Sequence, residues 1–114
     1  MVTVDLALES RNENGWAVLQ VRGEVDLYTS PQLRDGITEL LDQGANRIVI
    51  DLSGIEFMDS TGLGVLVVGL KRAKERNGEF ALVCREGSVQ KILSITGLDR
   101  VFSIHGSVAE LTRA

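Results

Sequence analysis

The sequence predicts an α/β fold: a small, mainly parallel β-sheet of about five strands with an N-terminal antiparallel hairpin and four helices. Short branched segments alternate along the chain with amphipathic segments of helical spacing. A stretch rich in Asn and Gly at 11–15 separates the first two strand-like segments. The Ile-Val-Ile run at 48–50 is typical of a central strand that is covered on both faces. Right-handed strand-helix-strand connections then place successive strands parallel.

The first elements are expected to be a hairpin followed by a helix. Thr3 to Glu9 and Trp16 to Arg22 are short and alternating, which predicts the two strands of the hairpin. Ser30 is expected to cap the following helix, with Pro31 in its first turn. Apolar residues follow at helical spacing, and Gly44 comes just after them, so the helix is expected to end there.

The rest of the chain is expected to continue the alternation. The predicted segments are, in order, a strand over 47–52, a loop, a helix over 60–77, a strand over 80–84, a helix over 88–96, a strand over 101–104 and a helix over 108–113. Gly78 and Gly97 lie directly after predicted helices, where glycine favours termination. We expect Ile92 and Ile95 of the third helix to face inward.

Length and composition indicate one globular domain over residues 1–114, with 44% apolar and 25% charged residues. Twelve Lys and Arg against sixteen Asp and Glu give a net charge of −4, which argues against nucleic acid and favours a protein partner. The single cysteine, Cys84, is expected to be a buried thiol in a reducing compartment. The N-terminus resembles no secretory leader and no stretch is long enough to span a membrane, so we expect a cytoplasmic protein with no membrane partner.

The sequence offers no evident catalytic apparatus. The only histidine, His105, has no partner in sequence and is expected to be structural or solvent-facing. Cys84 should share a core-facing side of its strand with Phe80 and Leu82. Four carboxylates are expected near strand ends and are interpreted as solvated: Asp26, Asp51, Glu56 and Asp59. We therefore predict a protein that is not an enzyme, with no catalytic residue, no metal site and no cofactor.

Residues 57–64, Phe-Met-Asp-Ser-Thr-Gly-Leu-Gly, join the central strand to a helix. Asp59 or Ser60 could cap this helix by accepting hydrogen bonds from its first amides. Gly62 and Gly64 cost helix stability, and a cap does not require them, so they suggest a surface that another molecule can approach closely. Gly69 fits either such a surface or tight packing on the sheet. Ser60 is the residue of this segment at which phosphorylation makes immediate physical sense.

Several segments together carry a family resemblance that spans essentially the whole chain. They are Gly23-Glu24-Val25-Asp26, Ser30-Pro31, Ile48-Val49-Ile50-Asp51-Leu52, residues 57–64, and Thr96-Gly97-Leu98 before Val101-Phe102. In this order and at this spacing they resemble the anti-sigma factor antagonists, which are small bacterial STAS-domain proteins. The resemblance implies the STAS fold and a role in regulating transcription through a sigma factor. It shows no departure from the family's Asp-Ser-(Ser/Thr)-Gly-Leu-Gly motif.

The resemblance also implies site residues and partners. Ser60 would be the phosphoacceptor, supported by Asp26, Asp59 and Thr61. The partner would contact Gly23, Glu24, Asp26, Thr29, Ser60, Gly62, Leu63 and Gly64, and we expect an exposed apolar patch around Leu63. The implied partners are an anti-sigma factor with a GHKL-type serine kinase fold, which holds ATP and Mg²⁺, and a PP2C-type phosphatase.

Two other functions stay open. One is a STAS scaffold or transport-system subunit in which Ser60 is only a helix cap and no phosphoswitch operates. The other is a small nucleotide-binding protein or NTPase that uses the turn at 60–64. The second is disfavoured because no lysine stands beside that turn, whereas a phosphate-binding loop of the GxxxxGK[ST] type requires one.

Overall fold

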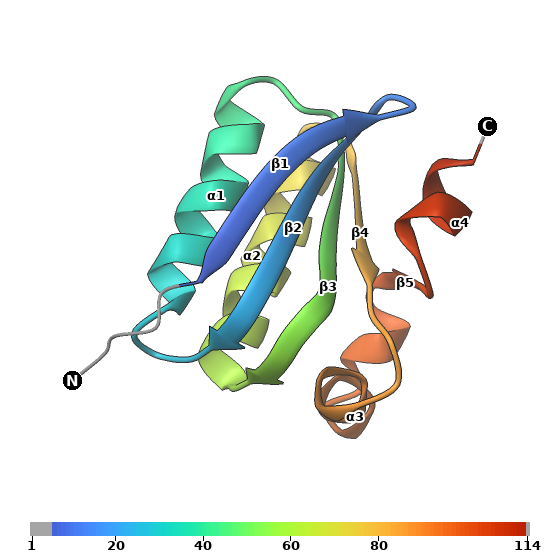
Figure 1. The fold of residues 1–114 in the computed structure, drawn as a ribbon. Coiled ribbons are helices and arrows are strands. Elements are labelled where there is room, and N and C mark those ends of the chain that lie inside the picture. Colours follow the sequence, from blue (N-terminus) through green and yellow to red (C-terminus); the bar gives the residue numbers. More distant parts are fainter. Residues whose placement is uncertain (1–5, 114) are drawn as a thin grey trace.

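The computed structural model describes residues 6–113, which form a five-stranded sheet with helices packed against it (Figure 1). The strand order is β1-β2-β3-β4-β5. β1 and β2 are antiparallel, and every other neighbouring pair is parallel. The predicted fold class is therefore confirmed.

The elements follow the chain in the predicted alternation. The strands are β1 (Ala7–Glu13), β2 (Trp16–Val25), β3 (Arg47–Met58), β4 (Glu79–Val83) and β5 (Ser103–His105). The helices are α1 (Ser30–Asp42), α2 (Ser60–Glu75), α3 (Ser88–Ile95) and α4 (Val108–Thr112), with a 3₁₀ turn η1 (Leu98–Arg100) after α3.

The sheet is buried on both faces, as the run at 48–50 predicts. Ile48 and Ile50 of β3 lie in the larger hydrophobic cluster, which also holds the buried side chains of α1, α2 and α3. Val49 points the other way and packs in a smaller cluster with Trp16 and with Val108 of α4. Figure 1 shows α1 and α2 behind the sheet and α4 apart from them. Alternation along β3 therefore supplies both cores.

The hairpin turn is tighter than predicted. β1 runs to Glu13, so only Asn14 and Gly15 form the turn, and both have positive φ (49° and 85°). Such a two-residue turn matches the twist of the paired strands, and Asn-Gly is its preferred sequence. Residues 3–5 of the predicted first strand lie outside the described residues.

β2 and β3 are longer than predicted. β3 continues to Met58, so the expected loop after residue 52 is strand, and β2 continues to Val25. The pairing of the two strands shifts register between residues 20 and 22 and again between 23 and 24. At Gly54 a Cβ would lie 2.8 Å from Cγ of Arg22, so the close approach of the two strands requires glycine there.

Three helix predictions have different outcomes. Gly44 ends α1 with φ of 85°, and its amide donates to the Leu41 carbonyl (3.0 Å), as predicted. The expected cap at Ser30 is wrong, because Ser30 is already helical and Thr29 holds the cap position. The inward placement of Ile95 is also wrong, since its side chain is 78% exposed. Leu93 lies on the buried side of α3, and two further residues turn the side chain about 200° around the axis.

Candidate functional site

Two loops meet where β2 and β3 end side by side. Val25 pairs with Met58, and the Asp59 amide donates to the Val25 carbonyl (3.0 Å). Asp26 and Asp59 therefore follow the carboxyl ends of neighbouring parallel strands, which is the edge where α/β sheets present loop side chains. The two aspartates that the sequence analysis associated with Ser60 come from loops that this bond joins.

Asp59 is the N-cap of α2. Its carboxylate accepts hydrogen bonds from the amides of Thr61 (2.9 Å) and Gly62 (3.4 Å) and a short one from the Thr61 hydroxyl. That hydroxyl is the main cause that lowers the pKa of Asp59 below its ordinary value; partial burial opposes it, and the amides of Thr61, Gly62 and Leu27 add to the lowering. The carboxylate thus stays charged and ties the start of α2 to the loop after β2.

Ser60 is the first residue of α2, and its side chain is exposed. Within residues 6–113 its hydroxyl has no hydrogen-bond partner, because Asp59 already accepts from the first amides of the helix. The capping interpretation therefore holds for Asp59 and not for Ser60. The prediction that this hydroxyl is accessible is confirmed.

Asp26 organises the loop between β2 and α1. Its Oδ1 accepts from the amides of Tyr28 (2.9 Å) and Thr29 (3.0 Å). The buried Thr29 hydroxyl accepts from the Asp26 amide (2.9 Å) and donates to the Glu24 carbonyl (2.8 Å). These bonds hold the loop in one conformation beside the start of α2.

A family of known proteins matches almost the whole of the described chain. The family model of the STAS domain matches residues 7–111. This chain belongs to the STAS domain family.

The relatives of this STAS domain are named by a common activity. It is 32% identical to the anti-sigma-F factor antagonist RsfB of Mycobacterium tuberculosis over 94% of this chain and 84% of that protein. It is 28% identical to the anti-sigma-B factor antagonist of Staphylococcus aureus over 90% of this chain and 94% of that protein. The crystal structure of an anti-sigma factor antagonist from Mycobacterium paratuberculosis superposes with a TM-score of 0.85 at 28% identity, covering 92% of this chain and 89% of that one.

The glycines of the STAS motif have different physical roles. A Cβ on Gly62 would lie 2.7 Å from both Met58 Cγ and Val25 Cγ1, so this glycine lets α2 pack on the sheet. A Cβ on Gly64 would meet nothing within 4 Å, so this position is open to solvent. Gly69 faces the Phe80 ring, 2.9 Å from its would-be Cβ. Tight internal packing therefore explains Gly62 and Gly69. Of these three glycines, only Gly64 lies where another molecule could approach the helix closely.

The residues expected to contact a partner divide by burial. Exposed members are Glu24, Ser60 and Gly64; half-buried members are Gly23 and Asp26; buried members are Thr29, Gly62 and Leu63. The expected exposed patch around Leu63 is wrong, because Leu63 is 5% exposed and belongs to the core. Helical spacing explains this position, since Leu63 lies on the same face of α2 as Leu66 and Leu70.

The exposed large apolar residues at this end of the sheet lie instead in the loop after β2 and near the end of β3, and the sequence analysis missed them. Leu27 is 65% exposed, Tyr28 is 83% exposed and Phe57 is 47% exposed. A signal was present in the sequence, since Leu27 and Tyr28 are apolar yet follow the predicted strand and precede the predicted helix.

The interpretation of the four carboxylates as solvated is wrong for Asp51, which is buried. Asp51 and Glu56 lie within β3, and the buried Asp51 carboxylate accepts from the amide (3.0 Å) and hydroxyl (2.6 Å) of Ser53. Across residues 6–113 no three His, Cys, Asp or Glu side chains are grouped so that they could hold a metal ion. In the same part of the chain, no helix has the length and apolar character needed to cross a membrane.

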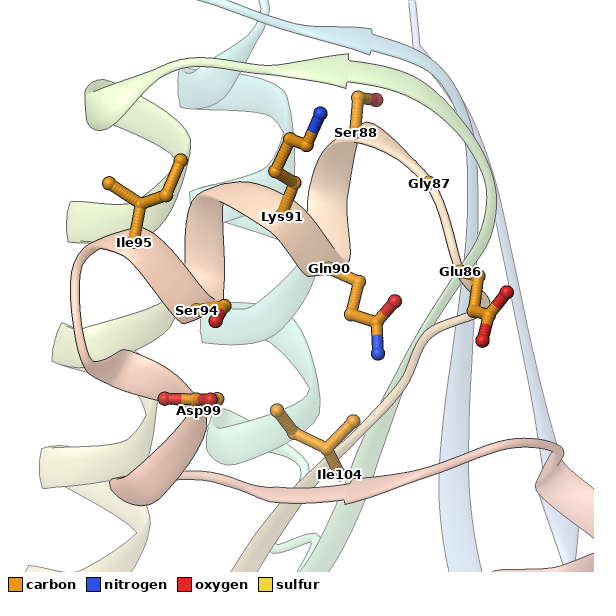
Figure 2. Close-up of a pocket in the computed structure, with 9 residues that line it drawn as sticks. All are labelled: Glu86, Gly87, Ser88, Gln90, Lys91, Ser94, Ile95, Asp99 and Ile104. Carbon is orange, nitrogen blue, oxygen red and sulfur yellow. The ribbon is translucent and has the colours of Figure 1, made fainter.

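A hollow of about 900 Å³ lies beside α3 (Figure 2). Its lining residues are Glu86, Gly87, Ser88, Gln90, Lys91, Ser94, Ile95, Asp99 and Ile104. None of them belongs to the site around Ser60.

His105, next to this region, has its Nε2 2.7 Å from the Ser103 hydroxyl. Cys84 packs in the larger core with Phe80 and Leu82, as predicted, and burial raises the pKa of its thiol.

Proposed function

We propose that this protein is an anti-sigma factor antagonist controlled by phosphorylation of Ser60. The unphosphorylated chain binds an anti-sigma factor that has a GHKL-type serine kinase fold, and the bound sigma factor is released. Phosphorylation of Ser60 by that kinase ends the binding, and a PP2C-type phosphatase restores it. The names of the relatives, which align over almost the whole chain, support binding to an anti-sigma factor.

The observation that carries the proposal is the state of the Ser60 hydroxyl. It is exposed and lies at the first residue of α2, and the Asp59 side chain, not that of Ser60, caps the helix. A serine that served only as a cap would be bonded to the first-turn amides. A kinase needs a hydroxyl that it can reach without unfolding the acceptor protein, and Ser60 meets that requirement.

The phosphotransfer itself requires little from this chain. The Ser60 oxygen attacks the γ-phosphorus of ATP, its proton leaves, the bond to the β-γ bridging oxygen breaks, and ADP departs. The partner supplies ATP, Mg²⁺ and the proton acceptor. This chain holds the acceptor oxygen at a helix start that the Asp59 carboxylate fixes.

Electrostatics explains how one phosphate can end the binding. Phosphoserine carries about −1.5 to −2 charges near neutral pH. At about 6 Å from a partner carboxylate and an effective dielectric of about 20, the repulsion is on the order of 5 kcal/mol before salt screening. Even a third of that value weakens binding more than tenfold. The charged Asp59 beside the phosphate adds repulsion when an interface excludes water, and no large conformational change is needed.

A titration with a purified kinase of the anti-sigma factor class from the same genome tests the proposal. We expect wild type and Ser60→Ala to bind with similar affinity, and Ser60→Glu to bind at least about tenfold more weakly. Ser60→Ala is also the matched control for folding, since the hydroxyl has no partner among the described residues. Equal affinity of wild type and Ser60→Glu would contradict the switch and favour a STAS scaffold.

A further inference from the structure

The loop between β2 and α1 presents two apolar side chains to solvent. Tyr28 is 83% exposed and Leu27 is 65% exposed. Large apolar side chains at such exposure, adjacent in sequence and beside a candidate modification site, are typical of an interaction surface. Aromatic rings are also among the residue types that dominate binding energy at protein interfaces.

The backbone that carries Tyr28 is fixed although its ring is free. The Tyr28 amide donates to Asp26 Oδ1 (2.9 Å), and the next amide, that of Thr29, donates to the same oxygen (3.0 Å). The buried Thr29 side chain closes the loop onto the Glu24 carbonyl (2.8 Å). When a partner binds the ring, the loop of this chain therefore loses little backbone entropy. This favours tight binding per unit of contact area.

The loop lies next to the start of α2. The Leu27 amide contributes to the lowered pKa of the Asp59 carboxylate, and Asp59 directly precedes Ser60. The Asp59 amide in turn donates to Val25 at the end of β2 (3.0 Å). A kinase that brings the γ-phosphoryl group of ATP to the Ser60 oxygen must approach this end of the sheet, where the Asp59–Val25 bond joins the start of α2 to the loop that carries the exposed Leu27 and Tyr28.

We propose that Tyr28, supported by Leu27, is the anchor residue that the partner kinase binds in an apolar pocket beside its ATP site. This inference rests on the proposed function, because the occupant of the loop surface is the protein that phosphorylates Ser60. Tyr28 acts in docking and takes no part in phosphoryl transfer. It therefore sets the affinity for the kinase and leaves the transfer step itself unchanged.

A comparison of variants tests the anchor against the purified kinase with ATP and Mg²⁺. We expect Tyr28→Ala to weaken binding at least about tenfold and to raise the KM for phosphorylation similarly, with kcat within about threefold of wild type. Tyr28→Phe keeps the apolar ring and should stay within about threefold of wild type in both affinity and KM.

The matched control is Ile95→Ala on α3. Ile95 is 78% exposed, and Figure 1 places α3 apart from the loop between β2 and α1. The affinity of the Ile95→Ala variant for the kinase should equal that of wild type. Because the Tyr28 ring is mostly exposed, Tyr28→Ala should melt within about 2 °C of wild type, so weaker binding would not reflect misfolding.

The outcomes separate this inference from the proposed function. If Tyr28→Ala binds like wild type while Ser60→Glu binds weakly, the anchor is wrong and the phosphoswitch stands. A fall in kcat at unchanged KM would also overturn the anchor, because it would assign Tyr28 to the transfer step. If no kinase of this class from the same genome binds or phosphorylates the wild type, the proposed function fails and the anchor fails with it.

Discussion

Replacing Asp59 by Ala should destabilise the fold, whereas replacing the neighbouring Ser60 should not. The Asp59 carboxylate accepts from the amides of Thr61 and Gly62 and from the Thr61 hydroxyl. The Ser60 hydroxyl has no partner within the described residues. Two adjacent side chains at the start of α2 are therefore expected to differ sharply in their contributions to stability.

The expected magnitude follows from the cap. Loss of an N-cap carboxylate costs about 0.5–2 kcal/mol, typically about 1. Three donors converge on Asp59, so we expect the upper half of that range. For a domain of this size 1 kcal/mol corresponds to roughly 4 °C in Tm, which gives a fall of about 5–8 °C. Ser60→Ala should change the free energy of unfolding by less than about 0.5 kcal/mol.

Denaturant unfolding at several pH values measures both effects. The folded-state pKa of Asp59 lies below the ordinary value of 3.8, so its charged form stabilises the fold. That contribution is fully present above the unfolded-state pKa and is lost as the pH falls through the folded-state pKa. The stability difference between wild type and Asp59→Ala should stay constant from about pH 7 to about pH 5 and shrink below 3.8.

Two results would refute this account of the helix start. If Ser60→Ala destabilises as much as Asp59→Ala, the serine is a cap and its hydroxyl is not free. If the difference between wild type and Asp59→Ala grows towards acid pH, the carboxylate is stabilised in its neutral form and the direction of the pKa shift is wrong.

Three further predictions follow from the packing. Gly62→Ala should destabilise the fold by about 1–3 kcal/mol in denaturant unfolding, because its Cβ would lie 2.7 Å from Met58 Cγ. Gly64→Ala should be neutral or stabilising by up to about 1 kcal/mol, because nothing lies within 4 Å of its Cβ. Equal effects of the two substitutions would contradict the different packing of the two glycines. Thr29→Val should cost about 1–3 kcal/mol while Thr29→Ser keeps both loop hydrogen bonds, and identical unfolding curves for the two variants would exclude that role. Burial raises the pKa of Cys84, so its thiol should react with a thiol reagent at least about tenfold more slowly in the native state than in denaturant, and equal rates would show that it is accessible.

The sequence alone predicted the order and type of most elements, because the patterns that decide them are local. The run at 48–50 alternates between two cores, and Gly44 ends α1 through its own backbone conformation. The motif at 57–64 located the start of α2 and the exposed serine correctly. In each case the deciding residues are neighbours in the chain.

The features that the sequence could not supply depend on contacts between distant segments. In the sequence Gly54 suggests a loop, but in the structure it lies in β3, and a Cβ there would be 2.8 Å from Arg22 Cγ of the neighbouring strand. Gly62 and Gly64 are the same residue two positions apart, yet only Gly62 faces other side chains of the fold. The exposure of Tyr28 likewise depends on how its loop is bonded between two strand ends.

Intact-mass measurement after phosphotransfer tests the central claim most directly. Wild type, Ser60→Ala and Thr61→Ala should be incubated with the purified kinase, ATP and Mg²⁺, and compared by mass. We predict that wild type and Thr61→Ala each gain the mass of one phosphoryl group and that Ser60→Ala gains none. A phosphate on Ser60→Ala, or an unmodified wild type in the presence of a kinase that binds it, would contradict the account of Ser60 as the switch.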